Sequence, residues 1–245
     1  MHSRLFTPAQ THIALLNQLH QKGYETEELQ KVQETYRLCM RIFNGRYRKN
    51  ERPSICHAVG AGSAMAEFDG RPALVKASML HAAYDSGVFP DAKTGSPSLS
   101  HRALVREIVG EETEQLVADY TTIEFEEGSP EALSQMEIPD CQRDIMLMKV
   151  AHEIDDIASG GIFFCSKFGP EHQTRLEACR AIATALENTK LADAFTAYIG
   201  EINQFEWVST IARDPKSFGY RLAPNWKTYL RLRRHARKGK HVRIV

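Results

Sequence analysis

The sequence contains no apolar run that approaches the roughly 20 residues needed to cross a bilayer, so no membrane-spanning helix is expected. Its first ten residues lack the apolar core of a secretory signal, and the expectation is a cytoplasmic protein. The five cysteines form no Cys-x-x-Cys pair and are scattered along the chain (Cys39, Cys56, Cys141, Cys165 and Cys179). This spacing argues against a thiolate zinc site and favours reduced thiols in the core.

Several sequence motifs of common enzymes are also missing. There is no Gly-x-Ser-x-Gly elbow, which positions the nucleophile of many serine hydrolases. The chain has neither a Gly-x-x-x-x-Gly-Lys phosphate loop nor a Gly-x-Gly-x-x-Gly turn after a strand, and no DNA-reading module is recognisable. Gly60 and Gly62 lie instead in an alanine-rich stretch, where they indicate that a neighbouring helix packs closely.

Neither sign of charge is in excess, because 31 Lys and Arg balance 31 Asp and Glu. The balance is uneven along the chain, since residues 226–245 hold eight basic side chains and no acidic one. The first 225 residues consequently carry 23 basic and 31 acidic side chains. A basic tail of this kind can attract nucleic acid or an acidic membrane surface; the alternative is a solvated terminal helix with a frayed end.

Hydrophobic residues recur at helical spacing along nearly the whole chain, and strand signals are almost absent. We therefore predict an all-α bundle, with residues 1–225 as one domain and 226–245 as a basic C-terminal helix or tail. Loops are expected over 88–100 and 124–140, where proline and small polar residues gather. The predicted helices cover about 7–23, 26–44, 54–67, 72–81, 100–109, 111–125, 140–159, 170–187, 191–213 and 226–237.

Two histidines on successive predicted helices are the clearest sign of chemistry. His57 and His81 both lie in apolar stretches that are rich in small residues. A later helix adds His152, Asp155 and Asp156, which are three or four residues apart and therefore share one face. Histidines on two neighbouring helices, with a distant cluster of histidine and acid, are typical of a metal site in a helical bundle. Their nitrogen and oxygen ligands suit Mn, Fe, Co, Ni or Zn.

These features resemble the HD-domain superfamily of metal-dependent phosphohydrolases, whose best-known branch is the RelA/SpoT-type hydrolase domain. The similar stretch runs from about Arg46 to Ser159. Three segments resemble the family's ligand-bearing motifs: Arg52-Pro-Ser-Ile-Cys-His57, Ala73-Leu-Val-Lys-Ala-Ser-Met-Leu-His81 and Ile145-Met-Leu-Met-Lys-Val-Ala-His152. The resemblance implies an HD-like helical bundle, to which further C-terminal helices are added.

The signature aspartate of that family is absent, because Ala82 follows His81. The stretch 81–89 is closer to a divergent HD-like branch whose motif reads roughly His-Ser-x-Tyr-Gly-Thr, followed by a segment similar to 106–116. Without the adjacent carboxylate, we predict a mononuclear rather than a dinuclear site. The expected ligands are His57, His81 and His152, completed by one of Asp85, Asp155 or Asp156.

Three further residues are candidates for the reaction itself. Tyr84 is placed to donate a proton, and Asp85 lies one turn after His81, where it can supply the carboxylate that Ala82 lacks. Arg52 belongs to a basic cluster with Arg46, Arg48 and Lys49, and arginine binds phosphate with two hydrogen bonds. The plainer interpretations are a packing role for the tyrosine and solvated loop charges for the basic cluster.

The residues and the resemblance favour an enzyme that acts on a small phosphorylated or otherwise anionic substrate. Metal-activated water would carry the reaction, or metal-bound oxygen, because HD-like folds also host oxygenases. The alternative is a catalytically inactive HD-like protein that serves as a ligand-binding or protein-interaction module. In that case the histidines bond only to backbone carbonyls or neighbouring acids.

Overall fold

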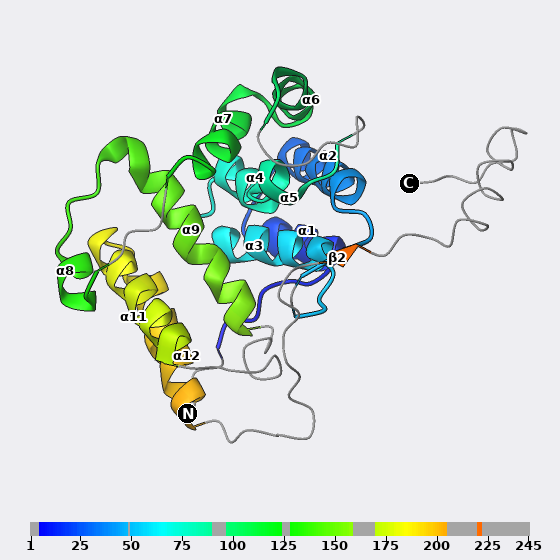
Figure 1. The fold of residues 1–245 in the computed structure, drawn as a ribbon. Helices are drawn as coiled ribbons and strands as arrows, with labels where there is room; N and C mark the ends of the chain where they lie inside the picture. Colours follow the sequence, from blue (N-terminus) through cyan, green and yellow to red (C-terminus); the bar gives the residue numbers. More distant parts are fainter. Residues whose placement is uncertain are drawn as a thin grey trace, which may run out of the picture.

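A computed structural model describes residues 5–48, 50–89, 97–123, 128–158, 170–204 and 220–221. Within these ranges the protein is helical nearly throughout, and the predicted all-α fold is confirmed (Figure 1). The helices are α1 (His12–Gln21), α2 (Thr26–Ile42), α3 (Ser54–Phe68), α4 (Pro72–Leu80), α5 (Ala83–Ser86), α6 (Leu99–Val109), α7 (Glu111–Tyr120), α8 (Pro130–Ser134), α9 (Asp140–Ala158), α11 (Pro170–Ala185) and α12 (Thr189–Gln204). Two short strands, β1 (Arg46–Tyr47) and β2 (Tyr220–Arg221), pair antiparallel.

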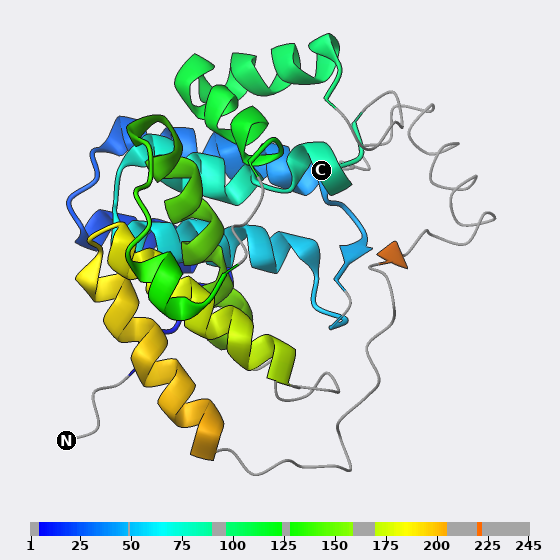
Figure 2. The same cartoon turned by 60° about the vertical axis from the view of Figure 1, so that its left-hand side comes forward.

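Helix α3 lies in the middle of the bundle and packs against α4, α9 and α1 (Figures 1 and 2). All ten residues from His57 to Ala66 are buried. A helix with apolar or small residues on every side is typical of the centre of a fold. Two groups of helices surround these: α2 and α7 pack on α4, with α6 against both of them, and α11 and α12 pack on α9, with α8 against α11.

The two central glycines explain how closely the neighbouring helices approach α3. A Cβ atom at Gly62 would lie 2.6 Å from Met79 Cγ of α4. A Cβ atom at Gly60 would lie 1.8 Å from Asp155 Oδ1 of α9. Side chains at these positions would push both neighbours away, so the prediction of close helix packing at Gly60 and Gly62 is confirmed.

The first helix begins later than predicted. The sequence suggested a start near Pro8, but α1 begins at His12, because the Thr11 side chain accepts a hydrogen bond from the Ala14 N–H and caps the helix there. The residues before it run as a non-helical segment along α3, where the Ala9 N–H donates to Ser63 Oγ at 2.8 Å.

Other differences concern helix ends and one short helix. Ser98 caps α6, which begins at Leu99 rather than at position 100, and α7 ends at Tyr120 rather than near position 125. The predicted loop 124–140 contains the five-residue helix α8, whose first turn holds Pro130. The predicted helix 226–237 and the basic tail lie outside the described residues, as does the end of the helix predicted over 191–213. None of the described helices has both the length and the apolar composition that membrane crossing requires.

A buried carboxylate joins three of the helices around α4. Glu114 of α7 is fully buried and accepts hydrogen bonds from Arg102 of α6 at 2.6 and 2.9 Å and from Arg106 of α6 at 3.0 Å. The Tyr84 hydroxyl of α5 also donates to it, at 2.8 Å. Burial alone would raise the pKa of Glu114, but these hydrogen bonds outweigh it and hold the pKa below its ordinary value.

This network makes part of the stability depend on pH. Because the pKa of Glu114 is lowered in the folded state, its contribution is complete above the unfolded value of 4.5 and is lost as the pH falls through the folded pKa. We expect Glu114→Gln to lower the free energy of unfolding at neutral pH by about 2 kcal/mol. Urea unfolding from pH 7 downward should show the difference from the parent shrinking below about pH 4.5. A difference that persists unchanged into the acid range would contradict this assignment.

Candidate metal centre

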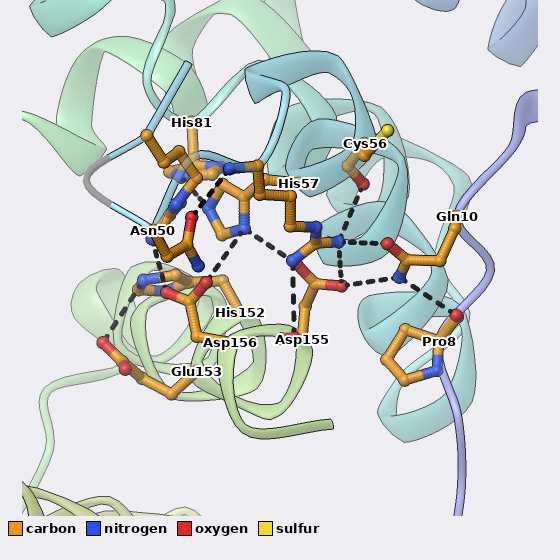
Figure 3. A network of polar contacts seen from close by, with 12 residues as sticks. Pro8, Gln10, Asn50, Cys56, His57, His81, His152, Glu153, Asp155 and Asp156 are labelled. Carbon is orange, nitrogen blue, oxygen red and sulfur yellow. Dashed lines mark hydrogen bonds and ion pairs between the residues drawn. The ribbon is translucent and has the colours of Figure 1, made fainter. Parts of the chain in front are cut away.

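Five of the six candidate metal ligands lie together, as Figure 3 shows, and Asp85 does not join them. His57 comes from α3, His81 follows the last residue of α4, and α9 provides the other three residues. One nitrogen from each of His57, His81 and His152 lies within 4.8 Å of the other two. Ligand atoms of His57, Asp155 and Asp156 form a second such group. The helical spacing and the packing of α9 on α3 therefore bring together residues that lie up to 99 positions apart in the sequence.

The hydrogen bonds of His57 and His81 fix which ring nitrogen carries a proton. His57 Nδ1 lies 2.8 Å from Asp155 Oδ2, and His81 Nδ1 lies 2.8 Å from the carbonyl oxygen of Ser78. Both partners only accept hydrogen bonds, so both Nδ1 atoms must donate. In the neutral rings the lone pairs are then on the Nε2 atoms, which face each other at 3.3 Å.

Both rings are held in the neutral form. Burial is the main effect that lowers the pKa of His57 and of His81 well below the ordinary histidine value. The charge of Arg48 lowers both values further, and nearby Asp156 only partly offsets the effect at His57. Two neutral rings with opposed lone pairs repel each other unless a cation lies within reach of both nitrogens. The arrangement of the two rings is therefore compatible with a bound cation.

Asp155 orients His57 through a saturated set of hydrogen bonds. Its carboxylate is fully buried and accepts from Arg52 Nη1 at 2.6 Å and Arg52 Nη2 at 2.8 Å. Gln10 Nε2 donates to the same group at 3.1 Å, and Arg52 Nη2 donates to Gln10 Oε1 at 2.5 Å. Together with His57, these donors occupy both carboxylate oxygens. A carboxylate behind a histidine in this way fixes the ring and raises its basicity toward a metal.

Asp156 lies closer to the open side of the cluster. Its Oδ2 pairs with Arg48 Nη2 at 2.5 Å, and its Oδ1 lies 3.5 Å from His57 Nδ1. The Asp156 side chain is 19% exposed, whereas that of Asp155 is fully buried. Of the two aspartates, Asp156 therefore has the more accessible carboxylate, and it lies on the Nδ1 side of His57.

The structure adds three residues that the sequence analysis did not single out. Tyr120 and Glu153 each lie 3.3 Å from a different ring nitrogen of His152, and Gln10 joins Arg52 to Asp155. Glu153 also pairs with Arg175 of α11. Burial would raise the pKa of Glu153, but its cationic neighbours lower it, so the group is ionised. Glu153 adjoins His152 in the sequence, but no local sequence pattern marks Tyr120 or Gln10 as part of the site.

The three residues predicted to act in the reaction have different surroundings. Arg52 lies in the cluster, where its guanidinium binds Asp155, Gln10 and the Cys56 carbonyl. Tyr84 is buried with its hydroxyl on Glu114. Asp85 is exposed and belongs to none of the potential ligand groups among the described residues. Asp85 was one of three candidates for the carboxylate beside the histidines. In the structure Asp156 of α9 lies there and Asp85 does not.

A cavity of about 60 Å³ adjoins the two facing histidines. His57, His81, Arg48, Ser54 and Ala82 are among its lining residues. A single water needs at least roughly 10–15 Å³ of such space, so the cavity has room for a few waters or a small oxyanion. A second cavity of about 330 Å³ shares Phe43 with the first. Its volume falls within the usual range for small-molecule pockets.

One protein family matches a stretch of the chain that includes part of this site. The model of DUF6817, a domain of unknown function, matches residues 42–124. The matched stretch runs from the end of α2 through α7 and contains His57 and His81, whereas α9 lies beyond it. No significant match to the chain was found among curated proteins.

The close approach at Gly60 can be tested by adding one methyl group. We expect Gly60→Ala to displace Asp155 and to lower the free energy of unfolding by about 1–3 kcal/mol. Gly200→Ala in α12 is the matched control, because a Cβ there meets no atom within 4 Å and should stabilise the helix by about 0.5–1 kcal/mol. Chemical unfolding of both variants measures the two changes. If the two variants were equally stable, the packing of α9 on α3 would not depend on the absence of a side chain at Gly60.

Proposed function

We propose that this chain is a divergent HD-like metalloenzyme with a single transition-metal ion held by His57, His81 and His152. The observation that carries the proposal is the pair of opposed Nε2 lone pairs, 3.3 Å apart, on two neutral and oriented imidazoles. Two nitrogens that bind one tetrahedral ion at 2.0–2.1 Å are themselves about 3.3–3.4 Å apart. The observed separation fits that requirement.

The donor set also limits the metal. Three imidazole nitrogens with a neighbouring carboxylate suit Mn, Fe, Co, Ni or Zn better than Mg or Ca. Such an ion, when bound, lowers the pKa of a coordinated water or accepts an oxygen ligand. We assign Asp156 as the carboxylate that completes the ligand set, and Asp155 as the group that orients His57, because its oxygens are already occupied.

The residues around the ligands favour a small anionic substrate, such as a phosphorylated one. Arg48 lines the cavity beside the histidines and is partly exposed, so it can bind an oxyanion that enters there. The 60 Å³ cavity accommodates only the reacting group. The adjoining cavity is large enough for the rest of a small molecule, and Phe43 lies at the border between the two.

Three features support the HD-like assignment. The histidines occur on consecutive helices, the aspartates follow on a later helix, and the helices pack so that all of them converge. Ala82 lines the cavity at the position directly after His81, where the superfamily has its aspartate. The missing carboxylate supports a mononuclear site and leaves two reaction types open, hydrolysis and oxygenation.

A non-catalytic binding module is the second candidate, and the ion pairs favour it. Arg48 and Arg52 already neutralise Asp156 and Asp155, so the cluster is balanced without a metal. In that case the cavities would bind a ligand or a partner without transforming it. The basic segment 226–245 could then attract nucleic acid or an acidic membrane through its charge.

Metal content separates the two functions. We expect the tag-free parent to hold close to one equivalent of Mn, Fe, Co, Ni or Zn by elemental mass spectrometry. His57→Ala/His81→Ala should lose it, because both opposed lone pairs are removed. His20→Ala, which changes an exposed histidine of α1, is the matched control and should retain the metal. Circular dichroism checks that each variant is folded. A parent that binds none of these metals, even after reconstitution, would exclude the metalloenzyme.

Anion binding tests the substrate class separately. We expect Arg48→Gln to weaken the binding of inorganic phosphate to the metal-loaded protein by about tenfold or more, because a charged hydrogen bond is removed. Its metal content should stay close to that of the parent. Arg41→Gln, on the exposed face of α2, should change neither quantity. Isothermal titration calorimetry measures the phosphate affinity, and elemental mass spectrometry measures the metal content. Unchanged phosphate affinity in Arg48→Gln would argue against an anionic substrate at this cavity.

A further inference from the structure

The 60 Å³ cavity beside the histidines offers few hydrogen-bond donors to an anion. Much of its wall is apolar and comes from Phe43, Ala58, Met79 and Ala82. An oxyanion that enters the cavity loses hydrogen bonds to water, and each oxygen left without a donor there costs free energy. Arg48 supplies charged donors on one part of the wall, so the oxygens that it does not reach need a donor from another lining residue.

The other polar groups on the cavity wall are already committed, with one exception. The Nδ1 protons of His57 and His81 are donated to the acceptors described above, and the Nε2 atoms of both rings have lone pairs rather than protons. The Ser86 hydroxyl donates to the carbonyl oxygen of Ala82 at 3.1 Å. Among the described residues that line the cavity, this leaves Ser54 as the side chain with an unused hydroxyl proton.

Ser54 is positioned by the first turn of α3. It is the first residue of that helix and precedes His57 by three positions, so both side chains lie on one face. Ala58 continues the same face, and all three residues line the cavity. No side chain caps the start of α3 at Pro53, so the Ser54 hydroxyl is not used to cap the helix. Ser54 is partly exposed, as a group that faces a cavity should be.

We propose that Ser54 is the neutral hydrogen-bond donor for the oxyanion that binds at the metal centre, where it acts together with Arg48. The Ser54 hydroxyl donates to one oxygen of the anion, and the Arg48 guanidinium donates to another. This inference rests on the proposed function, because it requires an anion that binds beside a metal ion held by the histidines. It narrows the reacting group to an oxyanion with oxygens on more than one side, such as phosphate.

The donor role predicts a selective effect of Ser54→Ala, which removes only the hydroxyl. Inorganic phosphate should bind the Co²⁺-loaded protein about tenfold more weakly, because a hydrogen bond to a charged acceptor is lost. The Co²⁺ affinity of the metal-free protein should stay close to that of the parent, because Ser54 is not a metal ligand. Ser54→Thr keeps a hydroxyl and should bind phosphate more tightly than Ser54→Ala. Isothermal titration calorimetry measures both affinities.

Ser134→Ala is the matched control, because it removes a serine hydroxyl from a helix that does not line the cavity. The Ser134 hydroxyl donates to the carbonyl oxygen of Glu131 within α8. This variant should change neither affinity. Urea unfolding should show Ser54→Ala to be about as stable as the parent, since the Ser54 hydroxyl makes no hydrogen bond within the described part of the chain. A merely structural role would lower stability and Co²⁺ affinity together.

The outcomes separate the role of Ser54 from the proposed function. If the parent binds Co²⁺ and phosphate, and Ser54→Ala binds phosphate equally well, the donor role is wrong and the metal site stands. The donor role is also overturned if Ser54→Ala loses Co²⁺ affinity, or if Ser54→Thr binds phosphate no better than Ser54→Ala. If the parent binds Co²⁺ but no phosphate, the anionic substrate and the donor role fail together. If the parent does not bind Co²⁺, the proposed metal site fails and the donor role fails with it.

Discussion

The site depends on the close contact between α3 and α9 at Gly60. Because that residue has no side chain, the Asp155 carboxylate reaches the surface of α3 and is buried there. A buried carboxylate requires partners, and Arg52, Gln10 and His57 provide them. The contact therefore fixes the His57 tautomer, and through it the direction of the lone pair that faces His81. The packing of α9 on α3 and the orientation of His57 therefore depend on the same contact at Gly60.

The cluster balances charge as well as geometry. Each aspartate has its own arginine, so these four residues add no net charge at this end of α9. Arg48 and Arg52 precede α3 by only a few residues and come from the same segment as β1. An ion that binds at the histidines therefore enters a region that is already neutralised.

Much of the fold could be predicted from the sequence, because the helices are amphipathic or rich in small residues. The exact helix ends were less predictable. The helix expected to start near Pro8 begins at His12, where Thr11 caps it. The convergence of these side chains was predictable because helical spacing places His152, Asp155 and Asp156 on one face. Gln10 and Tyr120 were not, because their contacts join segments 145 and 32 residues apart, and neither segment carries a local pattern that specifies its partner.

The ion pair between Arg52 and Asp155 also sets an order for the assembly of the centre. Gln10, Arg52, His57 and His81 are all present in the first half of the chain, but their acidic partners arrive with α9. A nascent chain that ends before α9 holds unpaired arginines and unoriented histidines, and the stretch matched by the family model ends at the same stage. Contacts between such distant segments form late in folding. The cluster can therefore take its observed geometry only in a chain whose second half has already been synthesised and docked.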